Sequence, residues 1–178
     1  MKKILAGILF AALFGGCRAS ETAAPTSNTQ TGTLKPLGDM PKFELERVAG
    51  GKLNSDELKG KVVVVDFWAT WCQPCIQEIP NYNKMKEEYS GKDVEILGVT
   101  LESGSLEDAK PKVEELKMAY PVVMGTDEVV DGFGGLIGFP TTFLVGKDGK
   151  VYKKYLGLTA KKKETIEKDI QALLEPAE

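Results

Sequence analysis

A run of four valines at 62–65, followed by Asp66, Phe67 and Trp68, is the feature that most constrains the fold of this chain. An apolar run without polar alternation is typical of a strand that is buried on both faces. Strands of this kind occur where helices cover both sides of a largely parallel sheet. The run therefore predicts an α/β layer architecture with this segment near the middle of the sheet.

The rest of the chain alternates between strand and helix patterns. Before the valine run we expect a half-buried strand at 42–48 and a single helical turn capped by Ser55. After it we expect helices at about 72–89 and 105–119 and a short helix capped by Thr126, with strands at 94–101 and 121–125 between them. Early alternation of this kind implies parallel neighbours joined by right-handed crossovers.

The last third of the chain predicts a hairpin and a closing helix. Asp148-Gly149 lies between two strand-like runs and is a strong tight-turn signal, so we expect antiparallel edge strands there. Ile166, Ile170 and the two leucines at 173–174 form one apolar stripe at helical spacing. We expect the lysines of this helix to lie opposite the stripe, on a solvated face. Together these elements predict a mixed α/β fold.

The N-terminus has the pattern of a targeting segment. The apolar run at 4–14 follows a positively charged start and is too short for the roughly 20 residues of a membrane span, but fits the roughly 7–15 of a signal peptide. We therefore expect residues 1–16 to be an export signal of the lipoprotein type, residues 17–37 a flexible tether, and residues 38–178 the folded domain. The protein is then extracytoplasmic, for instance periplasmic.

Gly15-Gly16-Cys17 resembles a bacterial lipobox, whose cysteine becomes the lipidated first residue of the mature protein, although Phe14 departs from that pattern. The alternative is ordinary cleavage, which leaves Cys17 as a free thiol. A free cysteine is a liability in an exported protein, so we favour lipidation and a membrane anchor through Cys17.

Composition narrows the function classes. The net charge is -3 and shows no basic excess, which argues against a nucleic-acid partner. Histidine is absent, which removes histidine bases and histidine metal ligands. Two neighbouring cysteines without histidine fall short of the four ligands of a zinc site, so we expect neither metal nor cofactor.

Cys72 and Cys75 lie where the buried strand meets the following helix. Residues three apart on a helix share a face, so their sulfurs can meet. Unpaired N–H groups and the macrodipole at a helix start favour an anion, which lowers the pKa of a thiol at Cys72. We expect Cys75 to be more buried, to stay protonated, and to resolve a mixed disulfide formed on Cys72.

The segment VVVVDFWATWCQPC resembles the active site of the thioredoxin superfamily and, within it, the exported TlpA/ResA-like thiol-disulfide oxidoreductases. FPTTFLVGKDGKV is similar to their second signature, and the resemblance extends over residues 38–174. It implies a thioredoxin-like mixed sheet flanked by helices, with an N-terminal strand extension. It also implies that Cys72 is the nucleophile and Cys75 the resolving cysteine.

The resemblance implies further roles around the substrate. Pro140 matches a cis-proline that faces the cysteine pair, and Phe139 before it offers its backbone to a bound substrate strand. Pro74 matches the proline that tunes the redox potential, and Trp71 an exposed aromatic side chain beside the site. Trp68 is expected to belong to the core.

Two acids match proton-handling positions of the family. Asp66 matches the buried acid of thioredoxin, and Glu78 the acid of the ResA type, which leaves open which of them takes the proton of Cys75. The residues alone also allow Asp66 to be a solvated acid at a strand end and Glu78 to be a surface helix residue.

The resemblance favours a reductase of extracytoplasmic protein disulfides, re-reduced by a membrane thiol donor, with cytochrome c maturation as one possible pathway. Two alternatives stay open. One is a peroxiredoxin-like thiol peroxidase, although Thr70 does not have the spacing to Cys72 that those enzymes use. The other is a copper-binding module that uses the two thiolates without catalysis. A further alternative to the reductase, the peroxidase and the copper-binding module is a disulfide with a purely structural role.

Overall fold

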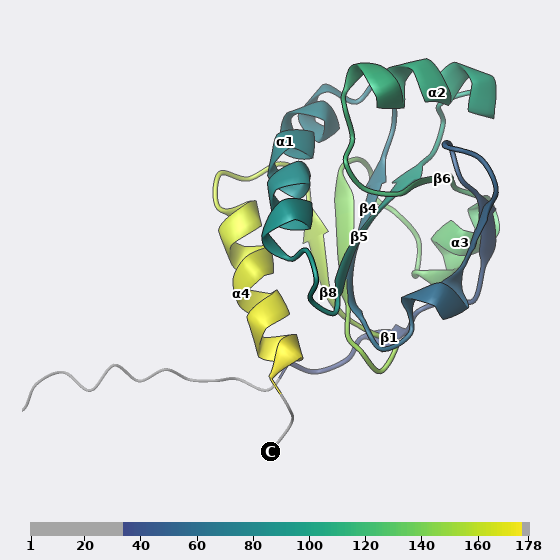
Figure 1. The fold of residues 1–178 in the computed structure, drawn as a ribbon. Coiled ribbons are helices and arrows are strands. Elements are labelled where there is room, and N and C mark those ends of the chain that lie inside the picture. The colour runs from purple at the N-terminus through teal and green to yellow at the C-terminus, as the bar shows by residue number, and fades with distance from the viewer. Residues whose placement is uncertain (1–33, 176–178) are drawn as a thin grey trace, which may run out of the picture. The chain divides into compact units, whose positions relative to one another are not determined.

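A six-stranded mixed sheet with helices on both faces forms the centre of the domain (Figure 1). The computed structural model describes residues 34–175. The strands follow one another across the sheet in the order β1 (Gly38–Asp39), β8 (Lys150–Leu156), β7 (Thr141–Val145), β4 (Val62–Trp68), β5 (Val94–Thr100) and β6 (Val122–Met124). The predicted mixed α/β fold is therefore confirmed.

The valine run lies where the sequence pattern placed it. All seven residues of β4 are buried. This strand pairs in parallel with β5 and antiparallel with β7, so both of its edges are hydrogen-bonded. A strand with neighbours at both edges and covered faces has no solvent side, which explains why its sequence shows no polar alternation.

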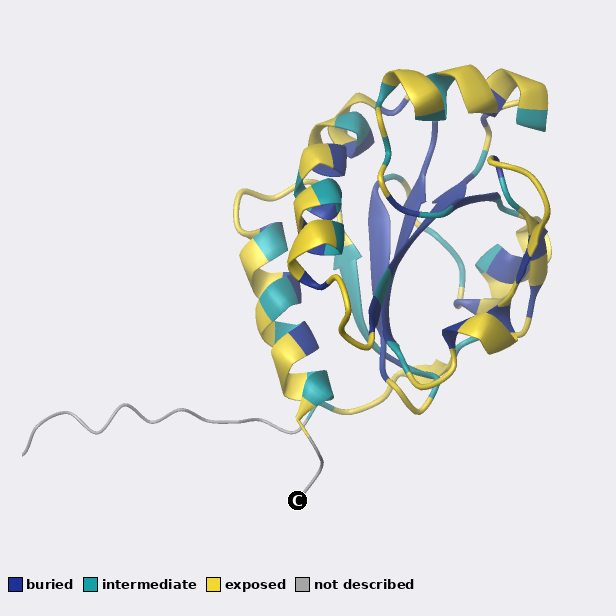
Figure 2. Ribbon diagram, in the orientation of Figure 1, coloured by how far each residue is buried: buried dark blue, intermediate teal, exposed yellow. Residues whose placement is uncertain are grey.

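Two hydrophobic layers, one on each face of the sheet, make up the core. Figure 2 shows that the central strands between them are buried. The helices α1 (Gln73–Glu88) and α4 (Lys162–Leu174) lie side by side over one face and bury the even-numbered side chains of β4. The helix α3 (Asp127–Gly132) contributes to the other layer. The helix α2 (Leu106–Glu115) buries mainly Ala109 and begins at the predicted cap region, with Ser105 as N-cap.

The N-terminal extension consists of three short strands. β1 adds to the outer edge of β8, whereas β2 (Glu44–Glu46) and β3 (Lys52–Asn54) form a separate antiparallel pair. The 3-10 helix η1 (Ser55–Leu58) follows, and its N-cap is Asn54. The prediction of Ser55 as the cap is wrong, because the Ser55 hydroxyl accepts a hydrogen bond from the Phe43 backbone N–H at 3.2 Å.

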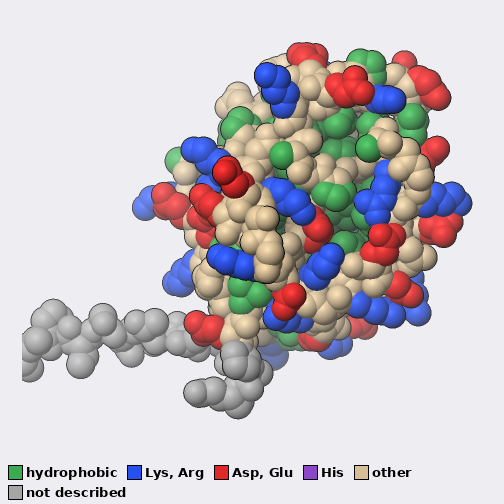
Figure 3. Space-filling model, in the orientation of Figure 1, with side chains coloured by type: hydrophobic (Ala, Val, Ile, Leu, Met, Phe, Trp, Pro, Cys, Tyr) green, Lys and Arg blue, Asp and Glu red, His purple; other side chains and the backbone are tan. Residues whose placement is uncertain are grey.

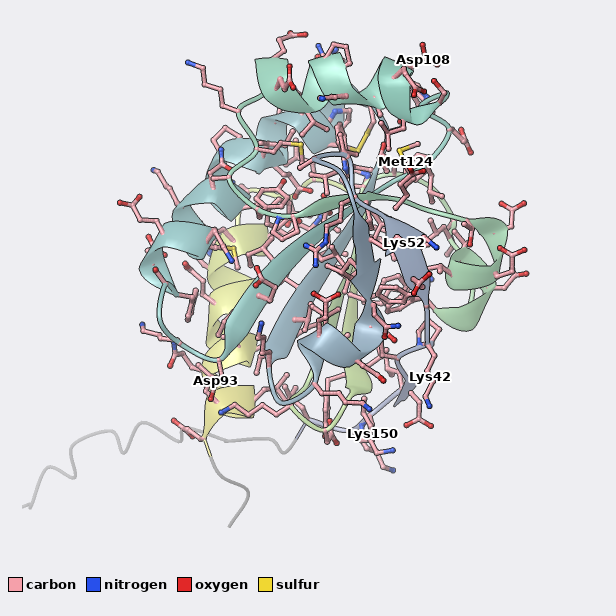
Figure 4. The ribbon with its side chains drawn as sticks, turned by 45° about the vertical axis from the view of Figure 1, so that its right-hand side comes forward. Lys42, Lys52, Asp93, Asp108, Met124 and Lys150 are labelled. Carbon is pink, nitrogen blue, oxygen red and sulfur yellow. A yellow bond between two sulfur atoms is a disulfide. The ribbon has the colours of Figure 1, made fainter. Side chains whose placement is uncertain are left out.

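The predicted hairpin is present as β7 and β8, with Gly149 at φ 76° in its turn. Its predicted place at the edge is wrong for β7, which also pairs with β4, whereas β8 lies toward the edge and pairs with β1 only at Lys150 and Val151. Lys150 in the hairpin lies at the opposite end of the domain from Asp108, which marks the start of α2 (Figure 4). The Lys150 ammonium donates to Asp39 at 2.8 Å and so ties β8 to β1.

Positive and negative side chains are interspersed over the face of the molecule shown in Figure 3. Among residues 34–175, no helix has the length and hydropathy needed to cross a membrane. The predicted signal peptide at 1–16, most of the tether at 17–37 and Cys17 itself lie outside the described residues.

Candidate active site

The two cysteines predicted as a redox pair form a disulfide at the start of α1, with their Cα atoms 5.3 Å apart. Cys72 is the N-cap of this helix, and its sulfur accepts a hydrogen bond from the Cys75 backbone N–H at 3.3 Å. Pro74 occupies the first turn, where a residue without an N–H interrupts no helical hydrogen bond. The local sequence thus builds a helix start that directs backbone donors at one sulfur.

Both cysteines are largely buried, but they differ in position. Cys72, which is 4% exposed, lines an open groove of about 500 Å³, whereas Cys75 is fully buried and does not line it. The other groove residues come from three segments of the chain: Trp71, Gln73, Pro74, Glu102, Gly138 and Phe139. An incoming group can therefore reach Cys72 before it reaches Cys75.

The far wall of the groove is the segment that ends in Phe139 and Pro140. The peptide bond between these two residues is cis, as the sequence analysis predicted. The Phe139 ring meets the Trp71 ring edge-on at a centroid distance of 5.9 Å. Pro140 is buried behind Phe139, and its carbonyl accepts a hydrogen bond from the Gly157 N–H at 2.8 Å. The structure therefore brings the predicted proline and aromatic residues together around Cys72.

A loop that the sequence analysis missed holds Trp71 in place. Trp71 is 58% exposed, and its indole N–H donates to the Glu102 carbonyl at 2.9 Å. The neighbouring Ser103 hydroxyl accepts from the Thr70 N–H at 3.0 Å and from the Thr100 hydroxyl at 2.7 Å. This loop follows β5 in the sequence, so no local pattern connects it with the cysteines.

Asp66 is buried beneath this region, with 1% of its surface exposed. Its carboxyl oxygen Oδ1 lies 2.9 Å from the Thr142 hydroxyl and 3.2 Å from the Tyr82 hydroxyl, and these two hydroxyls lie 2.9 Å apart. Burial raises the pKa of Asp66 to about 7, while the nearby charge of Lys162 opposes the rise. The alternative of a solvated acid at a strand end is wrong.

The three oxygens of Asp66, Tyr82 and Thr142 form a triangle with three short contacts. Hydrogen bonds from the two hydroxyls favour the ionised carboxylate and lower the pKa of Asp66, but burial outweighs them and raises this pKa to about 7. Burial therefore lets this group hold a proton near neutral pH.

Glu78 is also buried, so its interpretation as a surface residue is wrong. Its carboxylate accepts a hydrogen bond from the Lys162 ammonium at 2.8 Å, and both side chains are 4% exposed. Burial raises the pKa of Glu78, and the hydrogen bond and charge of Lys162 act against this rise. Glu78 therefore has the environment of a proton-handling acid, with a fixed counter-ion.

Lys162 corrects the expectation that the lysines of the last helix lie on a solvated face. It is 5% exposed and points into the domain. The signal was present in the sequence, because Lys162 precedes Ile166 by four residues and Ile170 by eight, which places it on the apolar stripe of α4.

The candidate site residues thus fall into two groups. The first surrounds the groove and comprises Trp71, Cys72, Pro74, Phe139 and Pro140, with Cys75 directly behind it. The second is a buried polar cluster, defined here as Asp66, Glu78, Tyr82, Thr142 and Lys162. Within residues 34–175, no group of three or more His, Cys, Asp or Glu side chains could hold a metal ion.

Known proteins resemble this chain in sequence. Residues 37–154 match the AhpC/TSA family. The thiol-disulfide oxidoreductase ResA of Bacillus subtilis is 34% identical over 145 residues, which cover 79% of this chain and 76% of that protein.

Solved structures show the same fold. A crystal structure described as a putative thiol:disulfide interchange protein DsbE from Chlorobium tepidum is similar with a TM-score of 0.72 and 30% identity, over 80% of this chain and 99% of that one. A pneumococcal exposed lipoprotein thioredoxin from Streptococcus pneumoniae is similar with a TM-score of 0.66 and 27% identity, over 75% of this chain and 100% of that one. The thioredoxin-like architecture implied by the sequence is confirmed.

Proposed function

Because this chain belongs to the AhpC/TSA family and is a thioredoxin-like thiol-disulfide oxidoreductase, we propose that it reduces disulfides of extracytoplasmic proteins through Cys72 and Cys75. The observation that carries the proposal is the position of this pair. Its disulfide closes at the start of α1, with one sulfur in an open groove and the other buried behind it.

The reaction begins with the reduced pair. The Cys72 thiolate attacks one sulfur of a substrate disulfide, a mixed disulfide forms, and the other substrate sulfur leaves as a thiolate that takes up a proton. Cys75 then loses its proton and attacks the Cys72 sulfur, which breaks the mixed disulfide and releases the second substrate thiol. Two electrons and two protons pass to the substrate, and the Cys72–Cys75 disulfide remains.

Cys72 is suited to be the attacking sulfur because it caps α1. The Cys75 N–H already directs its hydrogen toward this sulfur in the disulfide. In the reduced protein this donor and the helix dipole favour a negative charge on Cys72 and lower the pKa of its thiol. Cys75 lies in a fully buried position, where desolvation disfavours its thiolate until it attacks.

Asp66 and Glu78 are the candidates for the proton of Cys75. Both are buried, and burial raises the pKa of each carboxyl group above its ordinary value. Glu78 is on the same helix as Cys75, three residues further along, which puts the two side chains on one face. Asp66 approaches from β4 and has two hydroxyl partners.

The groove supplies a place for the substrate segment. Trp71, Phe139 and Pro74 line the groove beside Cys72, and the two aromatic rings, which meet edge-on, present apolar surface there. Phe139 precedes β7 in an irregular segment, so its backbone can offer hydrogen bonds to an extended peptide. These residues are the proposed substrate-binding residues, with Pro140 shaping the segment.

The proposed cellular setting rests on the N-terminal sequence. Residues 1–16 direct export, Cys17 carries a lipid, and residues 17–37 form the tether to the domain at 38–178. The lipoprotein thioredoxin of Streptococcus pneumoniae supports this setting, since its description names a lipid-anchored relative. A membrane thiol donor would then re-reduce the pair, and apocytochrome c is one candidate substrate.

Three measurements test the proposal. A Cys75→Ser variant cannot resolve the mixed disulfide, so it should accumulate a covalent complex with the physiological substrate on Cys72, and a Cys72→Ser control should not. The reduction potential of the Cys72–Cys75 pair decides whether the protein reduces or oxidises its substrate. A value of about -270 mV supports a reductase, whereas a value of about -120 mV indicates an oxidant and contradicts the proposal. Labelled fatty acid should be incorporated by the full chain and lost in Cys17→Ala.

A further inference from the structure

One buried ammonium group connects two segments of the active site. Lys162 is the first residue of α4, and its Nζ atom donates to the Glu78 carboxylate at 2.8 Å and to the Gly157 carbonyl at 3.1 Å. A buried ion pair is costly unless hydrogen bonds compensate the lost hydration. The two acceptors of the Lys162 ammonium provide this compensation and hold it in a fixed position.

Both acceptors belong to segments that surround the cysteines. Glu78 follows Cys75 by three residues on α1. On the other side, the Gly157 N–H donates to the carbonyl of Pro140 at 2.8 Å, and Pro140 follows Phe139 at the far wall of the groove. Lys162 therefore links the cysteine helix, which it contacts at Glu78, to the Phe139–Pro140 segment, which it reaches by way of Gly157.

We propose that Lys162 is a positioning residue for thiol-disulfide exchange, which holds the Glu78 carboxylate ionised and in place so that it accepts the proton of Cys75. In this step the Cys75 S–H bond breaks, its proton passes to Glu78, and the Cys75 sulfur bonds to Cys72. The substrate sulfur leaves Cys72 with the electron pair of the mixed disulfide. The inference rests on the proposed function and assigns the proton step within it.

The charges around Lys162 support this assignment. Of residues 34–175, Lys162 is the only buried cation, and its charge acts on two buried acids, Glu78 on α1 and Asp66 on β4. Its charge lowers the pKa of both Asp66 and Glu78, against the effect of burial. Without the ammonium, both carboxyl groups keep their protons to higher pH, and an acid that is already protonated cannot accept another proton.

The test separates the two steps of the reaction. Reduced protein is mixed with a small aromatic disulfide whose thiolate is coloured, so the first burst of colour reports attack by Cys72 and the second reports resolution by Cys75. Lys162→Met should slow the second phase about tenfold near pH 6.5, equivalent to a shift of about one pKa unit, and approach the wild-type rate at high pH. The first phase should change by less than about twofold, since the helix start is intact.

Three further variants isolate the mechanism. Lys162→Arg keeps the charge and should retain most of the second-phase rate. Lys163→Met removes the neighbouring lysine, which pairs with Glu88 and Glu167 nearer the surface, and should match the wild type. Lys162→Met combined with Glu78→Gln should be no slower than Glu78→Gln alone, because the lysine then has no carboxylate to hold.

A wild-type pH profile in Lys162→Met would overturn the inference. The inference would also be overturned if Lys162→Met slowed the second phase as much in the Glu78→Gln background as it does in the wild type. Circular dichroism shows whether Lys162→Met folds. If it does not fold, the second-phase rates of Glu78→Gln and of the double variant, which lacks both buried charges, still test the inference. A wild-type protein that releases no second thiolate would instead contradict the proposed function itself. The two failures are therefore distinguishable.

Discussion

The Trp71 indole donates its N–H to the carbonyl of Glu102, at 2.9 Å, so the loop after β5 fixes the aromatic side chain beside the nucleophilic cysteine. Glu102 itself has a backbone φ of 47°, an uncommon conformation for a residue other than glycine. The structure thus fixes an exposed aromatic ring in one orientation at the rim of the groove.

Replacing Trp71 by alanine should weaken substrate binding more than it weakens thiol chemistry. An aromatic edge contact contributes about 0.5–1.5 kcal/mol beyond its buried area, so KM for a protein disulfide should rise up to about tenfold. The rate at which a small alkylating agent modifies reduced Cys72 should change little. Trp71→Phe should give an intermediate KM, because it keeps an aromatic ring and loses the hydrogen bond to Glu102. Equal losses in both assays would contradict a role in binding.

Ser103→Ala should loosen the same loop. The substitution removes the acceptor of the Thr70 N–H and the partner of the Thr100 hydroxyl, and an unsatisfied buried group costs about 1–3 kcal/mol. We expect the free energy of unfolding in urea to fall by that amount and the Trp71 fluorescence to change. Ser90→Ala at an exposed position is the matched control, and a Ser103→Ala variant as stable as that control would refute the prediction.

Asp66→Asn should stabilise the oxidised protein at high pH. The pKa of Asp66 is raised to about 7 in the folded state from an ordinary value of 3.8, so the folded state binds the extra proton between these values. Wild-type stability therefore falls as the pH rises from about 4 to about 7, and the penalty is complete above that range, at most about 4 kcal/mol. Asparagine carries no charge and avoids this penalty.

Urea unfolding at several pH values checks this prediction. The advantage of Asp66→Asn should be present at pH 8 and disappear toward pH 4. Asp131→Asn, at an exposed acid of α3, should show no such dependence. A difference between Asp66→Asn and the wild type that is constant across this range would show that Asp66 is ionised throughout.

Thr142→Val should move the titration of Asp66 upward. The Thr142 hydroxyl bonds to the carboxyl oxygen and lowers the pKa of Asp66, so its loss favours the protonated form. The pH at which stability declines should therefore shift above 7, as followed by the same unfolding series or by carboxyl carbon chemical shifts. Thr141→Val alters the neighbouring strand position without touching Asp66 and should leave the titration of Asp66 in place. If Asp66 titrated in Thr142→Val as it does in the wild type, the predicted effect of the Thr142 hydrogen bond would be contradicted.

The parts of the site that the sequence analysis predicted depend on local patterns. A buried run followed by a helix start places Cys72 and Cys75, and the turn chemistry of Asp148-Gly149 places the hairpin that follows Pro140. These features are encoded within a few residues of one another. The resemblance to a known family added the cis-proline and the two acids, which no periodicity reveals.

Local sequence patterns did not predict the buried polar cluster. Lys162 and Glu78 are 84 residues apart in the sequence and meet only because α4 packs beside α1. The spacing of Lys162 on an apolar stripe indicates burial, but it cannot name the partner. Ser55 is a second case in which the sequence pattern did not name the partner. Its hydroxyl accepts a hydrogen bond from the Phe43 N–H, and Asn54 caps the helix instead.

The titration of Cys72 in reduced Cys75→Ser protein tests the account most directly, by the rate of alkylation or the ultraviolet absorbance of the thiolate as a function of pH. If the start of α1 stabilises the anion, the pKa of the Cys72 thiol lies well below the ordinary value of about 8.5. A pKa at or above that value, together with slow exchange with small disulfides, would contradict the account and leave the pair as a structural cross-link.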